Sequence, residues 1–96
     1  MTSEQINQLQ KLSKELKNIN EEILSNLDSN YSLKMVETED SVVIIGNSEG
    51  LINLASSLLE LAISREEGKH KHFGSGALDN CDKELEILYK RENQND

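Results

Sequence analysis

Leucine and isoleucine recur at alternating intervals of three and four residues through the first quarter of the chain. This spacing places them on one stripe of a helix, which consists of Leu9, Leu12, Leu16, Ile19 and Ile23. Ser3 is a suitable N-cap, and the Asn- and Asp-rich residues 26–30 are suited to ending a helix, so we predict a helix over about residues 3–26. The stripe either covers one face of this domain's own sheet or pairs with the same helix of a second chain.

Two short apolar segments follow at the distance of a β-hairpin. Residues 31–37 alternate apolar and polar side chains, as a half-buried strand does, and residues 42–45 are a continuous apolar run. Turn-forming residues at 38–41 lie between them, which predicts antiparallel pairing. Since the second strand is apolar on both faces, we expect a helix on one side of it and either the other helix or a partner protein on the other side.

The segment 46–68 predicts a second helix that starts in a glycine-containing turn. Asn47 or Ser48 is the expected N-cap, and Gly68 offers the left-handed conformation that would close a helix ending near Glu67. Apolar residues occupy more than half of the helix circumference, which predicts a heavily buried helix. The turn lacks the Gly-Lys-Ser/Thr ending of a nucleotide-binding loop, so we assign it a structural role.

The rest of the chain predicts two further strands, at residues 69–73 and 84–91, with a polar loop at 74–83 between them. The whole pattern is typical of an α+β fold. We expect a mostly antiparallel sheet of about four strands, one packed central helix and an additional N-terminal helix.

Length and composition limit what this domain can be. A chain of 96 residues suits one domain, with an N-terminal helix at 1–28, an α+β core at 31–91 and a polar tail at 92–96. With 35% hydrophobic and 3% aromatic residues, the core must be aliphatic. A formal net charge of -8 disfavours nucleic acid and anionic membranes, because binding to phosphates depends on Lys and Arg. The charge favours a basic protein partner.

Acidic residues concentrate in the middle of the chain. Between residues 31 and 68, seven acidic side chains stand against two basic ones. They gather at the ends of predicted elements, with Glu37, Glu39 and Asp40 at the hairpin and Glu66 and Glu67 at the end of the second helix. Such a patch would attract a cationic surface over a long range.

The candidates for metal binding or catalysis in this sequence are two histidines and one cysteine. His70 and His72 are two apart on a predicted strand and therefore share a face, and Cys81 follows in the loop. Structural zinc sites usually contain a second closely spaced ligand pair, which is missing here, so we predict no metal and no cofactor. Nothing marks an activating base beside Cys81, so we predict no catalytic residue and no enzyme. The competing hypothesis of a metal-dependent enzyme using these three residues predicts bound zinc.

The sequence gives no sign of an oxidising compartment or a membrane. Cys81 is the single cysteine, so an intrachain disulfide cannot form. The N-terminal residues lack the pattern of a signal peptide, and polar residues interrupt the most apolar window. We expect a cytoplasmic protein.

Four short motifs occur in a particular order: Gly46-Asn47-x-x-Gly50-Leu51, a Leu- and Ala-rich helix, Gly68-x-His70-x-His72-Phe73, and Glu84-Leu85-Glu86-Ile87. This order resembles a family of small bacterial immunity proteins over about residues 42–90. The resemblance implies a protein that neutralises a polymorphic toxin delivered between competing bacteria. It implies a binding protein, so it assigns no catalytic residue.

The resemblance and the charge together lead to one main hypothesis. The chain would be an immunity-type inhibitor that occludes the active site of a cognate toxin, for which a basic nuclease domain is one candidate. The candidate contact residues are Glu37, Glu39, Asp40, Glu66, Glu67, His70 and His72. The alternative is a dimeric structural or adaptor protein that associates through its N-terminal helix.

Overall fold

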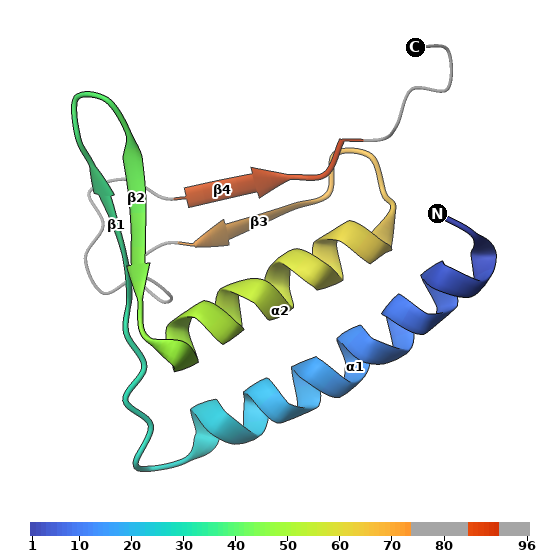
Figure 1. Cartoon of the computed structure of the whole chain (residues 1–96), viewed down its shortest axis with the longest axis horizontal. Coiled ribbons are helices and arrows are strands. Elements are labelled where there is room, and N and C mark those ends of the chain that lie inside the picture. Colours follow the sequence, from blue (N-terminus) through green and yellow to red (C-terminus); the bar gives the residue numbers. More distant parts are fainter. Residues whose placement is uncertain (74–84, 91–96) are drawn as a thin grey trace.

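The computed structural model describes residues 1–73 and 85–90, and these form an α+β fold as predicted (Figure 1). Its elements are, in order, α1 (Ser3–Ser25), β1 (Leu33–Glu37), β2 (Val42–Gly46), α2 (Ser48–Ser64), β3 (His70–Phe73) and β4 (Leu85–Leu88). The predicted loop at 74–83, which contains Cys81, and the predicted tail at 92–96 lie outside the described residues.

A capping box places the N-cap of α1 one residue earlier than predicted, at Thr2. The Thr2 hydroxyl accepts a hydrogen bond from the Gln5 backbone N–H at 3.1 Å, and the Gln5 side chain accepts one from the Thr2 N–H at 2.9 Å. Thr2 is therefore the N-cap and Ser3 the first helical residue. Thr2 is the better cap because Gln5 lies three positions after it and can satisfy the second N–H in return.

The second helix, α2, begins at the predicted cap Asn47 and ends sooner than predicted. Its last helical residue is Ser64, and Arg65 takes the left-handed conformation with φ 54°. The Ser64 hydroxyl donates to the Leu61 carbonyl at 2.7 Å, so a side chain satisfies one of the last carbonyls of the helix. Gly68, the predicted terminator, has φ 81° but lies in the turn that leads to β3.

The four strands form two separate two-stranded antiparallel sheets, so the expectation of one sheet of about four strands was wrong in this respect. One sheet pairs β1 with β2, and the other pairs β3 with β4. Figure 1 shows the reason: β3 and β4 run beside α2 along its length, whereas the hairpin β1–β2 stands crosswise at the start of α2. Strands that cross in this way cannot align their edges for hydrogen bonding.

The core lies where these elements meet. Leu33, Leu54 and Phe73 are its buried centre, and six partly buried residues surround them: Tyr31, Met35, Ile44, Leu58, Leu85 and Ile87. The helix α1 packs within the chain, on α2 and not on a sheet, with Ser13 and Asn20 buried in the seam. The Asn20 side-chain amide donates to the side-chain oxygen Oδ1 of Asn53 across this seam at 2.9 Å.

The molecule is thin, with principal-axis extents of 40 × 36 × 18 Å. The elements lie side by side in essentially one layer, as Figure 1 shows along the shortest axis. A thin layer cannot cover both faces of its own elements, which is why α2 is less buried than its composition predicted. Among residues 1–73 and 85–90, no helix combines the length and apolar character needed to cross a bilayer.

Candidate functional site

The turn Gly46–Gly50 fixes the hairpin against α2. The Asn47 side-chain oxygen accepts from the Gly50 N–H at 2.9 Å and from the Ser32 N–H at 3.1 Å, and its amide donates to the Asn30 carbonyl. The Asn47 N–H also donates to the Ser32 carbonyl at 3.1 Å. One side chain thus caps the helix and holds the chain that enters β1, which agrees with the structural role assigned to this turn.

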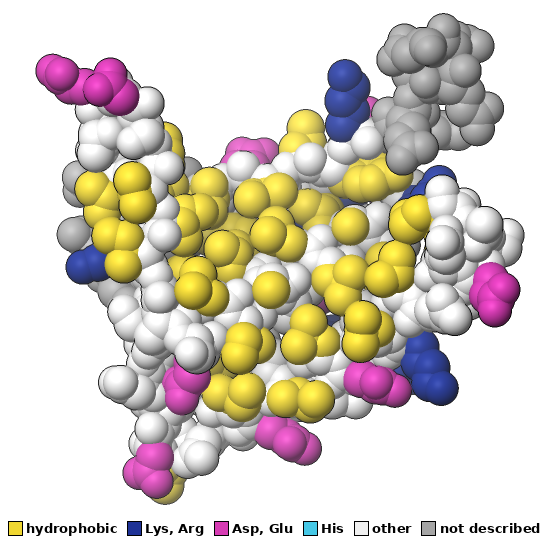
Figure 2. All heavy atoms as spheres, in the orientation of Figure 1, with side chains coloured by type: hydrophobic (Ala, Val, Ile, Leu, Met, Phe, Trp, Pro, Cys, Tyr) yellow, Lys and Arg dark blue, Asp and Glu magenta, His cyan; other side chains and the backbone are white. Residues whose placement is uncertain are grey.

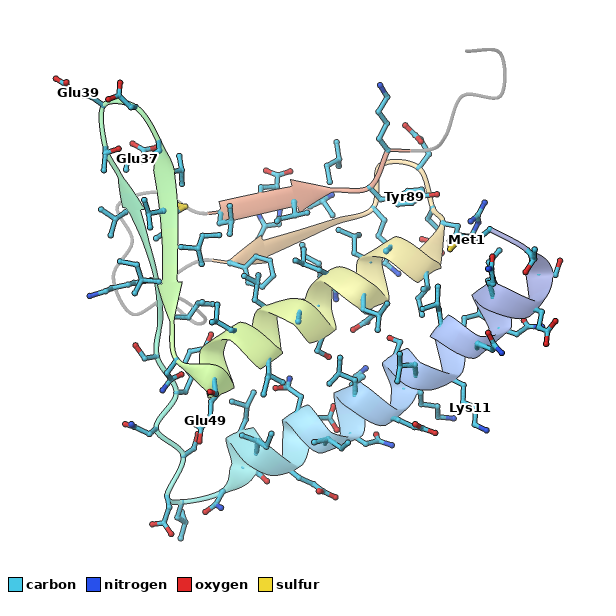
Figure 3. All side chains as sticks on the ribbon, viewed as in Figure 1. Met1, Lys11, Glu37, Glu39, Glu49 and Tyr89 are labelled. Atoms are coloured by element: carbon cyan, nitrogen blue, oxygen red, sulfur yellow. The ribbon has the colours of Figure 1, made fainter. Side chains whose placement is uncertain are left out.

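Gly50 and Glu49 complete this junction. A Cβ on Gly50 would lie 1.9 Å from the Ser32 carbonyl oxygen, so the backbones can meet here only because position 50 has no side chain. The Glu49 carboxylate, labelled in Figure 3, accepts from the Ser29 hydroxyl at 2.6 Å and from the Asn30 N–H at 2.8 Å. One of the four motifs that carry the family resemblance therefore sets the position of the hairpin.

One face of the hairpin packs on the core and the other is open. The register places Leu33, Met35 and Ile44 on the inner face, where they join the core. On the outer face, the exposed fractions of Val36, Val43 and Ile45 are 38%, 38% and 47%. Neither helix of the described residues covers this outer face, so the expectation that a second helix would cover β2 was wrong.

The two helices expose apolar residues as well. Leu51 is 45% exposed, and it shares a stripe of α2 with the exposed Ala55 and Ala62. On α1, Leu12 and Ile19 lie two turns apart and are each 52% exposed, because Ser13 and Asn20 occupy the seam instead. The predicted stripe of α1 is therefore only partly buried.

Figure 2 shows that hydrophobic side chains cover one broad face of the molecule, across the hairpin, α2 and α1. We call this surface the apolar face. The elements that it crosses carry these exposed large side chains: Leu12, Ile19, Val36, Val43, Ile45 and Leu51. Acidic side chains lie around its edge in the same view. An apolar centre with a charged edge is the usual composition of a protein–protein interface.

The predicted acidic contact residues form two groups. Glu37, Glu39 and Asp40 are exposed at the hairpin tip, where Figure 3 labels the two glutamates. The turn there is held by Thr38, whose N–H donates to the Ser41 carbonyl at 2.8 Å.

The second group lies at the other end of α2. Glu66 and Glu67 follow the helix and are exposed, and His70 and His72 begin β3. Figure 1 places this end of α2 on the opposite side of the molecule from the hairpin tip. The fold thus puts the predicted acidic residues at two ends of the structure and does not gather them into one patch.

Sequence reasoning missed one neighbour of the histidines. His70 and His72 share a face of β3, as expected, and the register pairs His72 with Glu86 of β4. The three side chains offer ligand atoms within 4.8 Å of one another. The sequence could have suggested Glu86 only if the register of β3 and β4 had been known. That register could not be predicted, because a ten-residue loop was expected between the two strands.

Comparisons with known proteins give a single kind of match. No curated protein and no solved structure matches the chain. The family model Immunity protein 32 matches residues 41–90, which include β2, α2, β3, β4 and the Gly46–Gly50 turn, and leave out α1. Because this match covers more than half of the chain, the protein belongs to the Immunity protein 32 family and is an immunity protein of a toxin system.

Proposed function

We propose that this protein neutralises its cognate toxin by binding over the toxin's active site with the apolar face. The family supplies the class of partner. Two observations carry the proposal: Figure 2 shows hydrophobic side chains across one broad face, and the elements under that face carry large hydrophobic side chains that are between 38% and 52% exposed. Contiguous apolar surface on a small protein is typical of an interaction site, because leaving it in water is unfavourable.

The dimensions of the molecule suit this role. A standard interface buries about 800 Å² on each partner, and a face of 40 × 36 Å offers that area. The aliphatic side chains would supply most of the affinity, because their removal from water is favourable by about 25 cal/mol per Å² of buried apolar surface. The loss of translational and rotational freedom on association offsets part of this gain. Acidic residues around them would mainly raise the association rate.

The acidic edge favours a basic toxin surface. The chain carries a net charge of -8, and the exposed hairpin tip concentrates three carboxylates. A nuclease that binds phosphates with Lys and Arg has such a surface around its active site, which makes a basic nuclease domain one suitable toxin class. Occlusion would then act both sterically and by neutralising the cations that hold the substrate.

The first experiment identifies the partner and tests protection. The tagged protein is captured from its own cells, the bound protein is identified, and the C-terminal domain of that protein is expressed with and without this chain. We expect a one-to-one complex and loss of toxicity on co-expression. Toxicity that persists while the two proteins are co-expressed would contradict the neutralising role.

Substitutions on the hairpin then test the binding face. Val43→Asp places a charge at the centre of the outer hairpin face, and we expect at least a tenfold loss of toxin affinity, about 1.4 kcal/mol or more. Leu27→Asp is the matched control, because Leu27 is 102% exposed in the turn after α1. Circular dichroism checks that both variants fold. Equal affinities of the two variants for the toxin would remove this face from the interface.

Charge reversal separates the two acidic groups. A triple variant that changes Glu37, Glu39 and Asp40 to Lys should slow association and weaken its dependence on salt. The corresponding change of Glu66 and Glu67 to Lys tests the far end of α2. Unchanged association rates in both variants would show that neither acidic group steers the toxin.

A second candidate function is a dimeric structural or adaptor role through α1. The 52% exposure of Leu12 and Ile19 favours it, because a second copy could cover both side chains. Deletion of residues 1–28 would not be a clean test, since α1 packs on α2 and its loss would expose that seam. Light scattering on the wild type and on a Leu12→Glu, Ile19→Glu variant is cleaner. A dimer that the variant converts to a monomer would favour this function.

A further inference from the structure

The outer face of the β3–β4 sheet gathers two imidazoles and a carboxylate. Antiparallel pairing sets His72 opposite Glu86 and His70 opposite Leu88, so these four side chains point away from the core. Phe73, on the other face of β3, is buried. The sheet therefore presents His70, His72 and Glu86 together at an exposed surface.

Their ligand atoms are close enough to share one ion. Each pair lies within 4.8 Å, and the two imidazole rings meet edge to face with centroids 4.7 Å apart at 80°. Ligand atoms around a tetrahedral Zn²⁺ with bonds of about 2.1 Å lie about 3.4 Å apart. Exposed side chains can close the difference by small rotations about their side-chain bonds, with no change in the backbone.

A backbone contact already prepares one histidine for coordination. His70 Nδ1 lies 3.1 Å from the Gly68 carbonyl oxygen. Since a carbonyl can only accept, Nδ1 is the donor, and the neutral ring then carries its lone pair on Nε2. A ligating histidine commonly donates its other ring N–H to a carbonyl or carboxylate in this way, which fixes its tautomer and orientation.

The donor set indicates the class of ion. Imidazole nitrogen favours zinc and its transition-metal neighbours, whereas Mg²⁺ and Ca²⁺ favour oxygen ligands. Two histidines and one carboxylate are a known three-ligand zinc set that leaves one coordination position open. We propose that His70, His72 and Glu86 form a Zn²⁺ site on the β3–β4 surface, with the fourth position exposed to solvent. This proposal departs from our expectation of no metal, which considered Cys81 as the third ligand and did not consider Glu86.

Zinc titration of the full-length protein tests the site after the affinity tag has been removed, because a histidine tag would bind zinc itself. Competition with a chromophoric chelator measures affinity and stoichiometry. We expect one Zn²⁺ per chain and at least a tenfold loss of affinity in each of His70→Asn, His72→Asn and Glu86→Gln. Glu66→Gln is the matched control for the last change, because Glu66 is an exposed carboxylate outside the cluster, and it should leave the affinity unchanged.

Three further measurements make the result decisive. Cys81→Ser should leave Zn²⁺ affinity unchanged, and Co²⁺ bound at the site should show no thiolate charge-transfer band. Zn²⁺ should also raise the Tm of the wild type and not that of His72→Asn, because an ion that binds only the folded chain stabilises it. The proposal is overturned if the protein does not compete with the chelator, if Glu86→Gln binds as the wild type does, or if Cys81→Ser abolishes binding. None of these readouts depends on a toxin, so failure here leaves the proposed neutralising role untouched.

Discussion

Gly50→Ala tests whether the junction between hairpin and α2 depends on a missing side chain. Helix propensity alone predicts that alanine would stabilise α2 by about 1 kcal/mol. The structure predicts the opposite, because the new Cβ would lie 1.9 Å from the Ser32 carbonyl oxygen and 2.8 Å from its carbonyl carbon. These are backbone atoms, so a rotamer change cannot relieve the clash.

The expected magnitude follows from what must move. Displacing Ser32 breaks its two hydrogen bonds with Asn47, worth about 1 kcal/mol each. Strain from overpacking adds about 1–3 kcal/mol. After subtracting the helix-propensity gain of about 1 kcal/mol, we expect Gly50→Ala to lower the free energy of unfolding by about 2–4 kcal/mol. That is a large share of the stability of a small domain.

Urea denaturation followed by far-UV circular dichroism measures this loss as a shift in the midpoint. Gly68→Ala is the control, since a Cβ at Gly68 meets nothing within 4 Å although its φ is +81°. We expect only the backbone cost of about 1 kcal/mol there. A Gly50→Ala variant as stable as the wild type would refute the proposed close approach.

Three other tests probe further contacts by the same denaturation assay. Asn47→Ala should lower the free energy of unfolding by about 2 kcal/mol, because α2 loses its N-cap and the hairpin loses its hydrogen bond to Asn47. A loss below about 0.5 kcal/mol, which is the low end for a lost cap, would contradict this. Asn20→Ala and Asn53→Ala should be coupled by about 1 kcal/mol in a double-mutant cycle, and additive effects would show that their hydrogen bond contributes nothing. Glu60→Gln should cost less than about 1 kcal/mol, since its 3.5 Å pair with Lys71 is partly exposed, and a larger loss would indicate a further role.

Much of the local structure could be read from the sequence. The two helices, the four strands, the hairpin and the cap at Asn47 follow from side-chain periodicity and from turn chemistry, which act over a few residues. The Gly46–Gly50 motif also pointed to the family that the comparison identified. Boundaries were less exact, as Thr2 and Ser64 show, because a cap depends on which side chain completes the hydrogen bonds.

The proposed binding surface depended on the arrangement of the elements in space. Periodicity placed Leu12 and Ile19 with the buried residues of α1, but the small side chain of Ser13 and the amide of Asn20 occupy the seam instead. The apolar character of β2 likewise predicted burial between layers, and the thin fold left its outer face open. A sequence shows which side chains favour burial, but it does not show whether this chain or another one covers them.

The same division holds for the histidines. Their spacing determined that both imidazoles share one face of a strand, because side chains alternate along a strand. Only the tertiary structure set the register that brings Glu86 beside His72 and the turn that brings the Gly68 carbonyl to His70. Residues 72 and 86 are far apart in sequence, so no local rule fixes their pairing. The hydrogen-bonded register of two strands decides it, and that is a property of the folded chain.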